Sequence, residues 1–94
     1  MFCFQCQEAA KGIGCTVRGV CGKDAEVSNL QDLLIYAAKG VANIVRNSNL
    51  DVNELGVVNH EILNSLFVTI TNANFDEQSI ERQIRKVLKL RDGL

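Results

Sequence analysis

All four cysteines of this 94-residue chain fall within its first 23 residues. They are Cys3, Cys6, Cys15 and Cys21, and their spacing is C-x2-C-x8-C-x5-C. Four of the chain's seven glycines lie beside or between them, at positions 12, 14, 19 and 22. Glycine reaches positive φ and lets backbone N–H groups approach another group closely. The pattern predicts an irregular loop over residues 1–23 and leaves several roles open for its cysteines.

Four cysteine thiolates are the ligand set of a [4Fe–4S] cluster, a [2Fe–2S] cluster or a structural zinc ion. The alternatives are two disulfides, or cysteines that act as small apolar residues. Structural zinc usually takes two short C-x2-C pairs, and this chain has one, Cys3 with Cys6. The single histidine, His60, lies outside the loop, and we expect it to be solvated rather than a ligand. The spacing therefore favours an iron–sulfur cluster over zinc, and zinc over the remaining roles.

The sequence also indicates a compartment and excludes some partners. A membrane span requires about 20 consecutive apolar residues, and no stretch of this sequence approaches that length. The first residues lack the basic and apolar regions of a secretory signal peptide. We therefore expect a cytoplasmic protein, in a reducing environment where clustered cysteines hold metal more often than they pair. The net charge of −1 gives no reason to expect nucleic acid or a membrane surface as partner.

The rest of the chain is typical of helices. Proline is absent, and apolar residues recur at helical spacing over about 28–46, 59–71 and 77–92. Ser28 has the form of a capping residue for the first helix, although Asp24 is suited to cap an earlier first turn. The β-branched residues at 68–71 also favour a strand, but their spacing and the lack of a strand partner favour a helix.

Three amphipathic helices with short connections predict an up-down-up bundle. We expect the basic residues of the third helix to form a solvated face: Arg82, Arg85, Lys86 and Lys89. We expect the large apolar residues of the first two helices to form the core, among them Leu30, Leu33, Leu34, Leu66 and Phe67. The predicted fold is all-α: a Cys/Gly-rich loop over 1–23 and a three-helix bundle over 24–94, which together make one domain.

The stretch "MFCFQCQEAAKGIGCTVRGVCGK", followed by "NLQDLLIYAAKG" and "NHEILNSLFVTITNANFD", resembles the N-terminus of the hybrid cluster proteins. These are also called prismane proteins or hydroxylamine reductases, and the likeness spans essentially the whole chain. In the family form of strict anaerobes, cysteines with this short spacing hold a cubane [4Fe–4S] cluster. The resemblance implies that Cys3, Cys6, Cys15 and Cys21 are its four ligands. A second family form, with wider spacing between the third and fourth cysteines and a [2Fe–2S] cluster, is not matched here.

The resemblance also implies what surrounds this region. Family members are several times longer oxidoreductases, and reduce hydroxylamine to ammonia and water at a second, hybrid Fe–S–O cluster held by later domains. We therefore expect the electron-transfer part of such an enzyme, inactive by itself and with no catalytic residue of its own. Its expected partners are an electron-donor protein (a reductase or ferredoxin-like), the remaining domains and, when isolated, a second copy of itself. The alternative is a zinc-stapled or cluster-free helical module that acts in protein interaction.

Overall fold

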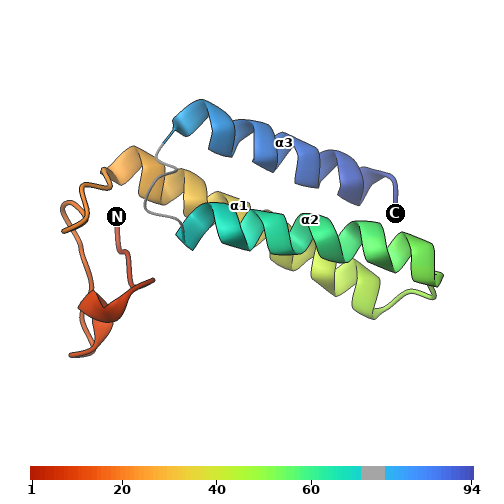
Figure 1. Cartoon of the computed structure of the whole chain (residues 1–94), viewed down its shortest axis with the longest axis horizontal. Helices are drawn as coiled ribbons and strands as arrows, with labels where there is room; N and C mark the ends of the chain where they lie inside the picture. Colours follow the sequence, from red (N-terminus) through yellow and green to blue (C-terminus); the bar gives the residue numbers. More distant parts are fainter. Residues whose placement is uncertain (71–75) are drawn as a thin grey trace.

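The computed structural model describes residues 1–70 and 76–94 and contains three long helices (Figure 1). They are α1 (Ala25–Arg46), α2 (Val52–Ile70) and α3 (Glu77–Asp92). A single turn of 3-10 helix, η1 (Gln7–Ala9), lies in the cysteine-bearing segment. Within the described residues the only extended pairing is an isolated bridge between Cys3 and Cys15. The predicted all-α class is therefore confirmed.

Helix α1 begins earlier than the Ser28 pattern predicts. The side chain of Asp24 accepts a hydrogen bond of 2.8 Å from the backbone N–H of Val27, so the alternative start at Asp24 is the correct one. Ser28 is buried inside the helix instead of capping it. The helix ends at Arg46, as predicted, where the Asn47 N–H bonds back to the last turn.

The predicted start of the second helix at residue 59 is wrong, because α2 begins at Val52. The carboxylate of Asp51 accepts a hydrogen bond of 2.8 Å from the Glu54 N–H and caps the helix there. Gly56 lies within α2, where packing of the nearby Val58 outweighs the low helix propensity of glycine. The described part of α2 ends at Ile70, and the predicted end at Thr71 lies outside the described residues.

Helix α3 agrees with its prediction at both ends. The side chain of Asp76 accepts hydrogen bonds of 3.0 Å from the Gln78 N–H and from the Ser79 hydroxyl. Gly93 follows the last turn, and its N–H bonds to the carbonyls of that turn. Glu81 and Arg85, four residues apart, form an ion pair of 2.8 Å on the exposed face of the helix.

The three helices run up, down and up, and α1 packs against both others, most extensively against α3 (Figure 1). Their shared core consists of small and medium apolar side chains from all three helices: Val27, Leu34, Ala37, Val41, Val58, Ile80, Ile84 and Val87. No helix in the described ranges has the length and apolar character needed to cross a bilayer.

The predicted core of α2 is wrong. Leu66 is 41% exposed and Phe67 62% exposed, and on α1 Leu33 is also exposed. The face of α2 that turns inward instead carries Glu61, Ser65 and other small or polar residues. Its polar groups are satisfied by α3, because the Gln83 amide donates to the Glu61 carboxylate at 3.2 Å and to the Ser65 hydroxyl at 3.0 Å. A polar seam therefore joins α2 to α3, and the apolar stripe of α2 faces outward.

Candidate metal centre

The segment of residues 1–23, which we call the cysteine head, lies at one end of the bundle (Figure 1). It lies beside the start of α1, which it precedes directly, and near the last turn of α2. Thr69 and Ile70 of that turn border the same cavity as three of the cysteines. The head thus packs beside the start of α1 and the last turn of α2.

Two of the cysteines are held together by the backbone. The Cys3 N–H donates to the Cys15 carbonyl at 2.8 Å, and the Cys15 N–H donates to the Cys3 carbonyl at 2.9 Å. Gly14 makes this approach possible, because a Cβ at that position would lie 2.2 Å from the Cys3 carbonyl oxygen. Both cysteines are half-buried. The bridge fixes two sulfur-bearing residues that are far apart in the sequence as neighbours.

Cys6 and Cys21 lie on tight turns and are exposed. Cys6 precedes η1, and its carbonyl accepts a hydrogen bond of 3.0 Å from the Ala9 N–H. Cys21 lies in a turn where the N–H of Gly22, at φ +101°, donates to the Gly19 carbonyl at 2.9 Å. A side chain at Gly19 would be tightly packed, since a Cβ there would lie 3.2 Å from the Cys21 sulfur and the neighbouring atoms would have to shift.

Three of the four predicted ligands meet at one small cavity. Cys3, Cys6 and Cys21 line a space of about 90 Å³ together with Gln5, Lys23, Thr69 and Ile70. Cys15 does not line it, although the backbone bridge places this residue next to Cys3. His60 is exposed on α2, outside the head, as predicted.

Lys23 is the site residue that sequence reasoning did not single out. It is only 5% exposed, and its ammonium group lies 3.4 Å from the Cys3 sulfur and 3.0 Å from the Gln5 side-chain oxygen. The signal available in the sequence was the slight excess of basic residues around the cysteines. A cation beside sulfur suits a site that accumulates negative charge.

The donor set fits a thiolate-bound metal group chemically. All four cysteines are free thiols, and a lysine ammonium lies against one of them. Among the described residues, however, no three cysteine, histidine or acidic side chains gather closely around a single point. The head therefore supplies the right ligands at one end of the bundle, with the sulfurs spread around a cavity.

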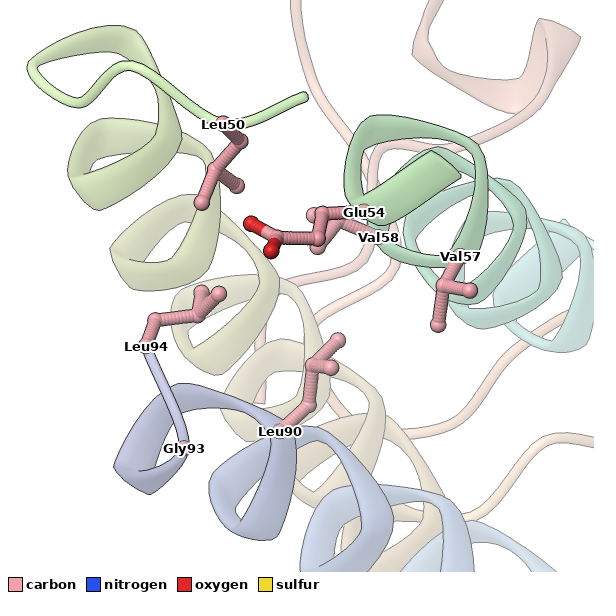
Figure 2. Close-up of a pocket in the computed structure, with 7 residues that line it drawn as sticks. All are labelled: Leu50, Glu54, Val57, Val58, Leu90, Gly93 and Leu94. Carbon is pink, nitrogen blue, oxygen red and sulfur yellow. The ribbon is translucent and has the colours of Figure 1, made fainter. Parts of the chain in front are cut away.

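A second, more open cavity of about 400 Å³ lies between α2, α3 and the connection before α2 (Figure 2). Figure 2 shows the Glu54 carboxylate pointing into it, between the side chains of Leu50 and Leu90. Its lining holds no cysteine, histidine or basic side chain.

A protein-family model described as the Prismane/CO dehydrogenase family matches residues 1–94. The chain belongs to this family. Among its relatives in the prismane family, a hydroxylamine reductase of Acetivibrio thermocellus is 64% identical over 94 residues. Hydroxylamine reductases of Desulfitobacterium hafniense and Methanocaldococcus jannaschii are each 53% identical, over 98 and 94 residues respectively.

These alignments cover 100% of the chain but 17% of each relative. The chain thus spans about one sixth of the length of the curated relatives it matches. No solved structure matches it significantly. The predicted membership of the prismane family is confirmed, while the assignment of the four cysteines as cluster ligands stays a prediction.

Proposed function

We propose that this chain is the N-terminal, iron–sulfur electron-transfer region of a hydroxylamine reductase. The observation that carries the proposal is the cysteine head itself: four free thiols in one segment, three of them around one cavity beside a buried lysine. Membership of the prismane family and similarity to proteins named hydroxylamine reductase support it. The wider activity, reduction of hydroxylamine to ammonia and water, belongs in this proposal to the rest of the longer protein.

Cys3, Cys6, Cys15 and Cys21 would hold a [4Fe–4S] cluster through their thiolates. When bound, such a cluster supplies one-electron transfer without making or breaking a substrate bond. The chain's own residues bind and orient it. The bridge between Cys3 and Cys15 sets the spacing of two ligands, and Cys6 and Cys21 line the cavity together with Cys3.

The proposal gives the chain partners rather than a substrate. An electron-donor protein, a reductase or ferredoxin-like protein, would deliver electrons to the head, and the remaining domains would receive them at a hybrid cluster. Once four cysteines are committed to the head, this chain has no further cysteine for a second cluster. We propose accordingly that it does not reduce hydroxylamine by itself. We also propose a cytoplasmic location, because free thiols persist in a reducing compartment.

The test is the visible spectrum of protein purified without oxygen. We expect a brown protein whose broad absorbance bleaches with dithionite, and loss of the colour in Cys6→Ser. Thr16→Ser, an exposed change in the same head, serves as the matched control and should keep the colour. A colourless anaerobic protein with stoichiometric zinc would instead support the alternative, a zinc-stapled module that acts in protein interaction.

A further inference from the structure

Lys23 and Cys3 are in contact although 20 residues separate them in the chain. We propose that Lys23 is a positioning residue whose ammonium hydrogen-bonds the Cys3 thiolate and raises the reduction potential of the centre in the head. The inference rests on the proposed function, since it requires an iron–sulfur cluster on the cysteines. It adds a specific residue that sets how readily the head accepts an electron.

The burial of Lys23 is the first observation. Lysine is almost never fully buried unless its charge is paired, yet Lys23 is 5% exposed. Among the ion pairs of the described residues, none includes Lys23. Its polar neighbours are the neutral oxygen of Gln5 at 3.0 Å and the sulfur of Cys3 at 3.4 Å. When Cys3 binds a cluster as a thiolate, its sulfur would supply a negative charge beside the buried ammonium.

The backbone around Lys23 fixes where its side chain starts. Its carbonyl accepts a hydrogen bond of 2.7 Å from the Gly19 N–H, and the next residue, Asp24, caps α1. A Cβ on Gly19 would lie 3.0 Å from the Cβ of Lys23, so the glycine makes room for the lysine stem. Lys23 is thus anchored both to the head and to the first helix, which aims its ammonium at the cavity.

The charge of Lys23 favours the reduced form of a cluster in this head. An added electron makes the site more negative, and a nearby buried cation stabilises that state more than the oxidised one. The step is the transfer of one electron from the donor protein to the cluster. The other basic residues of the head, Lys11 and Arg18, are exposed and therefore screened by water and salt.

The experiment is a redox titration of three variants purified without oxygen, with iron and sulfide quantified first. Lys23→Met keeps the apolar stem and removes the charge, Lys23→Arg keeps the charge, and Lys11→Met removes an exposed charge of the same head. We expect Lys23→Met to lower the reduced-to-oxidised ratio at a fixed potential about tenfold, which is about 59 mV for one electron. Lys23→Arg should restore most of that shift, and Lys11→Met should leave the potential unchanged.

The outcomes separate the inference from the proposed function. A wild-type protein without iron and sulfide overturns the proposed function, and the inference with it. A loaded Lys23→Met protein with the wild-type potential overturns the inference alone. If Lys23→Met does not load, loading of Lys23→Arg supports the role of the charge, and failure of both variants contradicts it. Pulsed EPR of reduced wild-type protein with ¹⁵N-lysine should show a nitrogen coupling that survives Lys11→Met, and its absence contradicts the contact.

Discussion

Cys3 and Cys15 are joined by a reciprocal pair of backbone hydrogen bonds, at 2.8 and 2.9 Å, in a head that otherwise consists of irregular segments, turns and the short helix η1. This contact brings two predicted ligands together through the polypeptide rather than through a metal. The carbonyl of Cys3 approaches the chain so closely at Gly14 that no side chain fits there. The geometry of the head therefore depends on this glycine.

We predict that Gly14→Ala prevents cluster binding and leaves the helices folded. A Cβ placed 2.2 Å from the Cys3 carbonyl oxygen forces the two bridged segments apart. Iron content per chain after anaerobic reconstitution should fall to a small fraction of the wild-type value, while the far-UV CD signal stays unchanged. The matched control is Gly40→Ala in α1, where a Cβ meets nothing within 4 Å, and it should stabilise the helix by about 0.5–1 kcal/mol. Full iron content in Gly14→Ala would show that the bridge is dispensable.

We predict that Gln83→Ala destabilises the bundle by about 1–3 kcal/mol, because it removes the hydrogen bond to the buried Ser65 hydroxyl and one of the two α3 partners of the Glu61 carboxylate, which keeps Lys86 at 3.1 Å. The Gln83 amide donates to Glu61 and Ser65 and accepts a hydrogen bond of 3.2 Å from Asn64. Urea unfolding followed by CD measures the change. Gln78→Ala, at an exposed position of the same helix, should change the free energy of unfolding by less than about 0.5 kcal/mol. Equal effects of the two substitutions would contradict the polar seam.

We predict that the stability of the bundle depends on pH through a contact between Glu26 of α1 and Glu77 of α3. A hydrogen bond with the Glu26 carboxyl, and the repulsion between the two charges, raise the pKa of Glu77 above its usual 4.5. Because the pKa of Glu77 is higher in the folded protein than in the unfolded chain, its contribution to stability is fully present below pH 4.5. This contribution is lost as the pH rises through the pKa of Glu77 in the folded protein. Between neutral pH and pH 4.5, the wild-type protein should therefore gain melting temperature relative to Glu77→Gln.

The Asp76 carboxylate titrates in a different window. A hydrogen bond from the Ser79 hydroxyl, and then one from the Gln78 N–H, lower its pKa below the usual 3.8. Its contribution to stability is present above pH 3.8 and is lost only as the pH falls through the lower pKa of the folded protein.

A difference in melting temperature between the wild-type protein and Glu77→Gln that does not change between neutral pH and pH 4.5 would contradict the assignment to the Glu26–Glu77 pair.

We predict that the isolated chain self-associates through the outward face of α2. Leu63 is 67% exposed and Phe67 62% exposed, and Leu66 and Ile70 extend the same apolar stripe. Contiguous apolar surface of this kind favours association. Light scattering on a size-exclusion column should show mass rising with concentration, and Leu63→Ser with Phe67→Ser should remove the rise. A strict monomer at all concentrations would contradict this prediction.

The parts of the fold that depend on neighbouring residues were predictable from the sequence. Helix α3 was predicted at both ends, because Asp76, Gly93 and the spacing of its apolar residues act within a few residues of one another. The start of α2 was not, because the helix continues through Gly56 and begins after Asp51, which caps it. At that position the low helix propensity of glycine is outweighed by the packing of the helix against the rest of the bundle.

The parts that depend on distant contacts were not predictable. The buried face of α2 was predicted from hydrophobicity, but it carries Glu61, whose carboxylate is bound by Gln83, 22 residues away, and by Lys86. The four cysteines were identified as the candidate site from spacing alone, whereas the burial of Lys23 against Cys3 depends on how the head folds back on itself. A single sequence carries no direct signal for such pairs.

The most direct test of the central claim is the iron, acid-labile sulfide and zinc content of protein prepared without oxygen and measured against polypeptide concentration. The account predicts about four iron and about four sulfide per chain, as a [4Fe–4S] cluster on four cysteines requires. About one zinc per chain without sulfide, or protein that takes up no metal when given iron and sulfide, would contradict it.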